Sequence, residues 1–142
     1  MRKRVVIASY DPKVRDRQAN LFEGLEVDIC AVRNGDEALK AAEEQAPDLM
    51  LIDPMLPRIS GFDVSRKVRD EQPELPIIML TSVYVGLAYR TEAVNRYGVT
   101  EYFEEPADQQ NIRNSLCHHL NMKDGATSDE QRNRSVRPGR QP

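Results

Sequence analysis

Residues 47–62 constrain the fold most, because a short apolar run in this segment ends in a single carboxylate. The run covers Leu49–Ile52, and Asp53 follows it directly. Four consecutive apolar residues without alternation are typical of a strand buried on both faces, as in parallel sheets. Asp53 is therefore expected at the carboxyl edge of a sheet, where open α/β folds bind ligands. The alternative is an aspartate that only caps or solvates the strand end.

Strand and helix signals alternate along the chain with short connections, which predicts βα units and a parallel sheet. Strands are expected over residues 4–8, 27–32, 49–52, 76–80 and 101–104. Helices are expected from residue 11 onward, over 34–45, 61–71 and 86–97, and from 108 to 120. With right-handed crossovers, this order predicts an α/β fold: a doubly wound five-stranded parallel sheet in a flavodoxin-like three-layer sandwich.

Helix boundaries are indicated by capping residues. Asp11 precedes Pro12, which suits the first turn of a helix. Asn34 and Glu37 have the spacing of a capping box. The first helix is expected to turn an apolar stripe inward, consisting of Val14, Leu21, Phe22 and Leu25.

Size and composition indicate one ordinary globular domain. The chain has 142 residues, of which 39% are hydrophobic and 30% are charged. No apolar run approaches the ~20 residues of a membrane-spanning helix, and the first apolar segment is too short for a signal peptide. A cytoplasmic protein that does not enter membranes is expected. Cys30 and Cys117 are expected to be small buried residues, since they lack metal-ligand spacing.

The charge is unevenly distributed between the body and the C-terminal segment. Residues 123–142 hold five basic and three acidic residues, a net charge of +2, which leaves −5 on residues 1–122 out of the total of −3. An acidic body does not suggest direct nucleic-acid binding. Residues 123–142 contain one valine and no leucine, isoleucine or aromatic residue. We expect a domain over 1–122 followed by a disordered tail or linker.

Several motifs, in this order and at these separations, resemble the receiver domain of two-component response regulators. The resemblance covers about residues 1–121. Each motif alone is weak, and together they are specific. They lie at residues 34–39 (NGDEAL), 47–53 (PDLMLID), 55–57 with 60–62 (MLP and SGF), 76–81 (PIIMLT) and 98–102 (GVTEY).

The resemblance implies a role for three residues. Asp53 matches the aspartate that accepts a phosphoryl group from a histidine kinase or phosphotransfer protein. Thr81 matches the hydroxyl residue that binds the new phosphoryl oxygens, and Tyr102 matches the aromatic switch residue. A protein partner is then expected on the face formed by helix four, strand five and helix five, with a homodimer as one option. Tyr84, Tyr89 and Tyr97 lie in or near helix four, where they suit such an interface, although core packing is the alternative for Tyr97.

Two parts of the family's usual site are replaced. The acidic pair that binds Mg²⁺ corresponds here to Ser9 and Tyr10, and the lysine before the proline after strand five is Glu105. Magnesium is therefore a doubtful cofactor, because neutral oxygens replace its carboxylate ligands. Asp11 and Asp53, together with Glu105, are candidates for a rearranged metal site. Otherwise Asp11 is a helix N-cap and Glu105 a solvated surface carboxylate.

One further feature follows from the resemblance alone. The bond between Glu105 and Pro106 is cis in many relatives.

Three functions remain as hypotheses. The first is a Mg²⁺-dependent phosphoacceptor that controls an output domain. The second is a degenerate receiver that acts as a protein-interaction module, which the replaced residues favour. The third is a phosphohydrolase with Asp53 as nucleophile. The sequence disfavours it, since it has no glycine-rich phosphate loop and no second aspartate two residues after Asp53. A non-enzymatic signalling protein is therefore expected.

Overall fold

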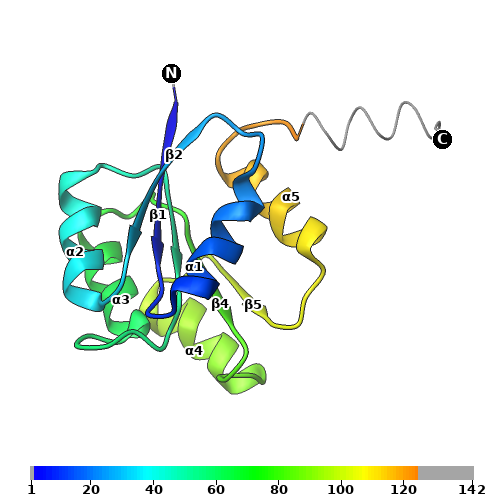
Figure 1. Cartoon of the computed structure of the whole chain (residues 1–142). Helices are drawn as coiled ribbons and strands as arrows, with labels where there is room; N and C mark the ends of the chain where they lie inside the picture. Colours follow the sequence, from blue (N-terminus) through cyan, green and yellow to red (C-terminus); the bar gives the residue numbers. More distant parts are fainter. Residues whose placement is uncertain (1, 125–142) are drawn as a thin grey trace.

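The computed structural model describes residues 2–124, which form a five-stranded parallel sheet flanked by helices (Figure 1). The strand order is β2-β1-β3-β4-β5, and every neighbouring pair is parallel. The strands are β1 (Lys3–Ala8), β2 (Val27–Val32), β3 (Leu49–Ile52), β4 (Ile77–Thr81) and β5 (Glu101–Glu104). The helices are α1 (Pro12–Ala19), α2 (Gly35–Glu44), α3 (Gly61–Glu71), α4 (Leu87–Tyr97) and α5 (Gln109–His119), with a 3-10 turn at Asn20–Phe22. The doubly wound fold predicted from the sequence is confirmed.

Alternation along the strands creates two apolar cores, one on each face of the sheet. On β3, the even-numbered residues Met50 and Ile52 pack with buried residues of α2, α3 and α4. The odd-numbered residues of the same strand, Leu49 and Leu51, pack with α5 and the 3-10 turn. Because β3 lies in the middle of the sheet, all four of its side chains are buried. The central strand therefore presents the residue after it, Asp53, from a rigid support.

The helix boundaries follow local chemistry closely. Asp11, Asn34, Ser60 and Asp108 each accept a backbone N–H of the following helix with their side chains. Gly98 ends α4 in the left-handed region, with φ of 76°, where glycine has no steric penalty.

The first helix is shorter than its expected apolar stripe. It ends at Ala19, and Leu21 and Phe22 are buried from the 3-10 turn instead. Its one fully buried side chain is polar, since Gln18 faces inward. None of the helices within residues 2–124 has the length and apolar character that a bilayer crossing requires.

The C-terminal end of the described chain is fixed to α5 by a buried ion pair. Asp124 accepts from Arg113 through two bonds, Nε–Oδ2 at 2.7 Å and Nη2–Oδ1 at 3.2 Å. The side chain of Arg113 is 15% exposed and that of Asp124 is 7% exposed. The Arg113 guanidinium also donates to the Leu21 carbonyl at 3.1 Å. Most of the segment expected to be a tail or linker, residues 125–142, lies outside the described residues.

We expect the substitution Arg113→Met to lower the free energy of unfolding by about 2 kcal/mol. Removing one partner of a buried ion pair is strongly destabilising, but Asp124 also accepts a hydrogen bond from Gln110 Nε2 at 3.2 Å, which limits the loss. Urea unfolding at neutral pH measures the loss. The matched control is Arg33→Met, which breaks an exposed i,i+4 pair with Glu37 and is expected to change stability far less, because water screens an exposed pair. Equal losses in the two variants would contradict the role of burial.

Candidate functional site

The carboxylate of Asp53 is half-buried at the carboxyl edge of the sheet and bonded to two neighbouring groups. Its Oδ1 accepts the Met55 N–H at 2.9 Å, and its Oδ2 accepts the Ser9 hydroxyl at 3.2 Å. Ser9 follows β1 and is fully buried. The Asp53 N–H donates to the Ala8 carbonyl at 2.9 Å. The sheet thus brings Ser9, one of the two replaced positions of the acidic pair, into direct contact with Asp53.

Burial raises the pKa of Asp53, while the bonds from the Met55 N–H and the Ser9 hydroxyl oppose the shift. In the part of the chain that the structure describes, no lysine or arginine forms an ion pair with this carboxylate. The raised pKa is the behaviour of a carboxylate that is partly desolvated without a compensating cation.

We expect the Asp53→Asn variant to be more stable than the wild type at neutral pH. A raised pKa in the folded state means that the folded protein binds the proton more tightly, so the contribution of Asp53 to stability falls as the pH rises through that pKa. The stability difference between the two proteins should shrink as the pH drops below the usual Asp range. Urea unfolding across this range measures it. A difference that stays constant with pH would show that Asp53 has an ordinary pKa.

The other residues of the β1–α1 loop point away from Asp53 or act in capping. Tyr10 is 66% exposed. Asp11 accepts the Lys13 N–H at 2.9 Å and is the N-cap of α1. Arg15 holds the loop by donating to the carbonyls of Ser9 at 2.7 Å and Tyr10 at 3.0 Å. Sequence reasoning missed Arg15, because nothing in its spacing indicates a bond back to this loop.

Glu105 lies on the β5–α5 connection and is directed toward α1. Its Oε1 lies 3.8 Å from Nη2 of Arg17, and its own side chain is 19% exposed. The Glu105 N–H donates to the Thr81 carbonyl at 2.7 Å, and the Glu105–Pro106 bond is cis. Glu105 therefore has a cationic neighbour in Arg17, which the sequence alone did not indicate.

Thr81 and Tyr102 both bond to the loop between β4 and α4. The buried Thr81 Oγ1 accepts the N–H groups of Val83 and Tyr84, each at 3.1 Å. The Tyr102 ring is buried, and its hydroxyl donates to the Tyr84 carbonyl. The Arg90 guanidinium lies 5.8 Å from the centre of the Tyr102 ring. Burial, with a further contribution from the charge of Glu104, raises the pKa of Tyr102 to about 12.

We expect Tyr102→Phe to destabilise the protein by about 1 kcal/mol, because the Tyr84 carbonyl loses its donor in a partly buried place. Tyr10→Phe is the matched control, since that tyrosine is exposed, and it should leave stability unchanged. Thermal or urea unfolding of the two variants beside the wild type gives the comparison. A Tyr102→Phe protein as stable as the wild type would show that the bond contributes nothing.

The donor set around Asp53 does not fit Mg²⁺ well. Within residues 2–124, no group of three His, Cys, Asp or Glu side chains is placed to hold a metal ion. Asp11 is engaged as a helix cap, and Glu105 faces Arg17. The rearranged site considered from the sequence is therefore not assembled. Protein magnesium sites usually combine one or two carboxylates with several waters, so Asp53 with neutral neighbours supplies the smallest such ligand set.

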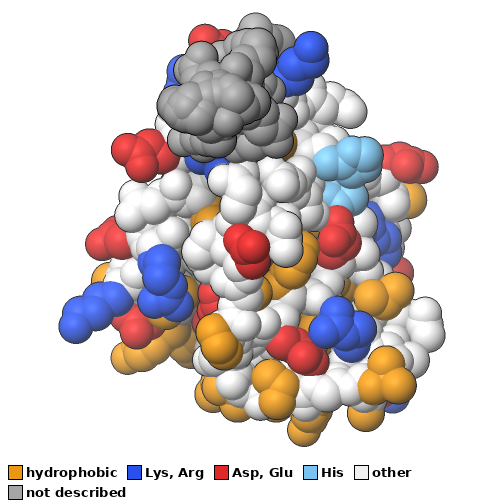
Figure 2. Space-filling view, turned by 90° about the vertical axis from the view of Figure 1, so that its right-hand side faces the viewer, with side chains coloured by type: hydrophobic (Ala, Val, Ile, Leu, Met, Phe, Trp, Pro, Cys, Tyr) orange, Lys and Arg blue, Asp and Glu red, His pale blue; other side chains and the backbone are white. Residues whose placement is uncertain are grey.

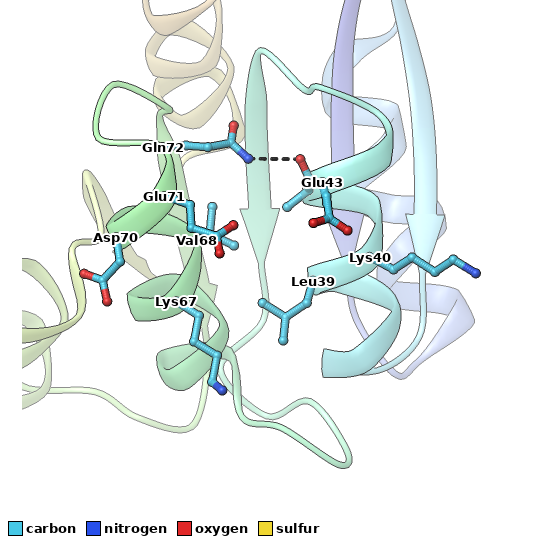
Figure 3. Close-up of a pocket in the computed structure, with 9 residues that line it drawn as sticks. Leu39, Lys40, Glu43, Lys67, Val68, Asp70, Glu71 and Gln72 are labelled. Atoms are coloured by element: carbon cyan, nitrogen blue, oxygen red, sulfur yellow. Dashed lines mark hydrogen bonds between the residues drawn. The ribbon is translucent and has the colours of Figure 1, made fainter.

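A separate groove lies between α2 and α3 and encloses about 430 Å³ (Figure 3). Its lining mixes apolar side chains such as Leu39 and Val68 with charged ones of both signs, including Lys40, Glu43 and Lys67. A hydrogen bond from Gln72 Nε2 to the Ala42 carbonyl, 3.0 Å long, joins the two helices. None of the predicted site residues lines this groove.

The strand order β2-β1-β3-β4-β5 is that of the flavodoxin-like doubly wound fold, and Asp53 lies at the carboxyl edge of the sheet, where such folds bind ligands. The chain belongs to the response regulator receiver domain family, whose family model matches residues 5–117.

Curated relatives and solved structures agree with this family. The chain is 37% identical over 82 residues to the DNA-binding response regulator MtrA of Mycolicibacterium smegmatis, a match covering 58% of this chain and 36% of that protein. It is 32% identical over 82 residues to the alkaline phosphatase synthesis transcriptional regulatory protein PhoP of Bacillus subtilis, covering 58% of this chain and 34% of that protein. The matches thus span about a third of these relatives' length.

A CheY-like receiver domain protein from Methanospirillum hungatei JF-1 superimposes with a TM-score of 0.74 and 25% identity, covering 85% of this chain and 95% of that one. Receiver domains of this family serve two-component signal transduction and are generally not enzymes. They typically bind Mg²⁺ at the phosphorylation site, and response regulators interact with histidine kinases or phosphotransfer proteins.

Proposed function

We propose that this receiver domain acts mainly as a protein-interaction module, and that Asp53 is a phosphoacceptor position without its usual cationic support. The observation that carries the proposal is the set of contacts around Asp53. Its carboxylate is bonded to the neutral Ser9 hydroxyl and the Met55 N–H, and no described lysine or arginine forms an ion pair with it. Phosphoryl transfer depends on neutralising negative charge, so this pocket is poorly equipped for it.

The replaced residues support the same proposal. Ser9 is buried against Asp53 as a neutral donor, and Tyr10 is turned to the surface. Glu105 adds a negative charge where family members have a lysine, although Arg17 lies beside it. We infer that Mg²⁺ binds weakly, since among the described residues no group of three His, Cys, Asp or Glu side chains is placed to hold a metal ion.

The interaction surface that we propose is formed by α4, β5 and α5. Only Ala93 is buried within α4. Five large apolar side chains of the β4–α4 loop and α4 are exposed, namely Val83, Val85, Leu87, Tyr89 and Val94. Figure 2 shows hydrophobic side chains gathered at the lower end of this side of the molecule, where α4 lies in Figure 1. An exposed apolar patch of this kind suits a protein partner, and a second copy of the chain is one such partner.

The alternative is a working phosphoacceptor that receives its phosphoryl group from a histidine kinase or phosphotransfer protein and controls an output domain. The arrangement of Thr81 favours it. Its oxygen accepts two N–H groups, which leaves its own hydrogen free to bond a phosphoryl oxygen. Relatives such as MtrA are DNA-binding regulators, but we do not expect the acidic body of this chain to bind DNA itself. The cytoplasmic location stays a prediction.

A Mg²⁺ titration tests the proposal. Amide chemical shifts of residues 8–11, 53–55 and 81–84 are followed by NMR as Mg²⁺ is added at neutral pH, with Asp53→Asn as the control. We expect small, non-saturating changes through the millimolar range in both proteins. Saturating changes around Asp53 at low millimolar Mg²⁺, absent in Asp53→Asn, would overturn the proposal of a degenerate receiver and favour a working phosphoacceptor.

A further inference from the structure

Helix α4 is attached to the domain with unusually little burial. Of its eleven residues only Ala93 is buried, whereas Leu87, Tyr89 and Val94 are exposed. Most helices in proteins gain their stability by packing an apolar face on the core, and α4 has almost no such face. The position of α4 must therefore depend on a few specific contacts, made by the loop before it, by Arg90, which donates to the Tyr102 carbonyl at 2.8 Å, and by Tyr97 in its last turn.

Tyr84, in that loop, has both of its backbone polar groups bonded to the two switch side chains. Its N–H donates to Thr81 Oγ1 at 3.1 Å, and its carbonyl accepts the Tyr102 hydroxyl. Thr81 ends β4 and Tyr102 lies on β5, so the bonds come from two neighbouring strands. Neither switch side chain can move far without breaking a bond to Tyr84 or displacing it.

The ring of Tyr84 connects the loop to α3 and α4. It packs edge-on against Phe62, with centroids 5.6 Å apart, and against Tyr89, with centroids 5.2 Å apart. Phe62 is the second residue of α3, which begins just after the loop from Asp53. Phe62 also packs on Tyr97 in the last turn of α4, with centroids 5.3 Å apart. Aromatic contacts of this geometry are attractive beyond their buried area.

We propose that Tyr84 is a positioning residue that couples Thr81 and Tyr102 to α4. The backbone of Tyr84 moves with the two switch side chains because it is bonded to both. Its ring holds α4 in place by packing directly on Tyr89 and by packing on Phe62, which in turn packs on Tyr97. The inference rests on the switch roles in the proposed function, yet the contacts themselves need no phosphoryl group. A second attachment of α4 comes from Glu104, which accepts the Gly86 N–H at 2.6 Å and pairs with Arg90 at 3.4 Å. The side chain of Thr81 takes no part in that attachment, although Thr81 and Glu104 are paired in the sheet. Arg90 also donates to the Tyr102 carbonyl at 2.8 Å.

A double-mutant experiment tests the coupling without Mg²⁺ or any phosphoryl analogue. Thr81→Val removes the oxygen that holds the Tyr84 N–H, and the amide shifts of residues 87–97 are compared with and without this change. The comparison is made in the wild type, in Tyr84→Ala and in Tyr84→Phe. We expect Thr81→Val to shift α4 amides in the wild type and in Tyr84→Phe, which keeps the ring. In Tyr84→Ala the shifts should fall to roughly a third or less.

Two further variants make the outcome decisive. Tyr89→Ala, on the exposed side of α4, should weaken the response of the α4 amides to Thr81→Val in the same way. This variant replaces Tyr84→Ala in the test if Tyr84→Ala does not fold. Glu104→Gln should leave the response to Thr81→Val intact, because it acts on the other attachment. The inference is overturned if α4 amides do not respond to Thr81→Val in the wild type, or if they respond in Tyr84→Ala and in Tyr89→Ala as strongly as they do in the wild type. Because no Mg²⁺ is present, such a failure leaves the proposal about Asp53 untouched.

Discussion

Replacing Gly61 by alanine should lower the free energy of unfolding by about 3 kcal/mol, near the upper end of the usual cost of overpacking. A Cβ at this position would lie 2.3 Å from the Asp53 carbonyl oxygen and 2.7 Å from the Pro54 Cα. Both atoms belong to the backbone, so no side chain can rotate to relieve the contact. The Gly61 N–H also donates to the Pro54 carbonyl at 2.9 Å, which holds the two segments together.

Urea unfolding monitored by circular dichroism measures this loss. The matched control is Gln109→Ala, also at the first residue of a helix but exposed, and it should change stability by no more than about 0.5 kcal/mol. Because the clash falls on Asp53 itself, the amide shifts of residues 53–55 should change in Gly61→Ala. A Gly61→Ala protein that unfolds at the wild-type urea concentration would show that α3 does not begin this close to Asp53.

Restoring the family's charged residues should create a magnesium site. The triple variant Ser9→Asp, Tyr10→Asp and Glu105→Lys introduces two carboxylates and an ammonium group at the positions where family members carry them. We expect it to bind Mg²⁺ about 100-fold more tightly than the wild type, which corresponds to about 2.7 kcal/mol. Without Mg²⁺ the added carboxylates repel Asp53, so the variant should be less stable than the wild type in a chelator and recover when Mg²⁺ is added.

Urea unfolding of the variant and the wild type, in chelator and in Mg²⁺, measures the effect. At a Mg²⁺ concentration 100 times its Kd, the ion should stabilise the variant by about 2.7 kcal/mol. A second variant with Ser9→Asn, Tyr10→Asn and Glu105→Lys keeps similar side-chain size without the added negative charge, and it should not respond to Mg²⁺. If Mg²⁺ stabilises the wild type as much as the triple variant, the native pocket already binds the ion well.

The fold could be predicted from the sequence because its main signals are local. The apolar run at Leu49–Ile52 requires burial on both faces, and such burial exists only in the middle of a covered sheet. N-cap residues such as Asn34 and Asp108 accept hydrogen bonds from backbone N–H groups that lie at most three residues further along the chain. The end of the first helix at Ala19 could not be predicted, because Leu21 and Phe22 continue its apolar spacing. The backbone forms a 3-10 turn there instead of a further α-helical turn.

The site was only partly predictable because several of its contacts join distant segments. The sequence indicated that Ser9 stands where a ligand of Mg²⁺ is usual, and the structure places Ser9 against Asp53. The sequence did not indicate that Arg17 faces Glu105, because the two residues are 88 positions apart in the chain. Likewise, nothing local shows that Tyr84 receives bonds from both Thr81 and Tyr102.

The most direct test of the central claim is an NMR titration of the wild-type chain with beryllofluoride and Mg²⁺, which together imitate an aspartyl phosphate. A pocket without cationic support should leave the amide shifts of Asp53, Thr81 and Tyr102 unchanged. Large, saturating shifts at all three residues, abolished by Asp53→Asn, would contradict this account and establish a working phosphoacceptor.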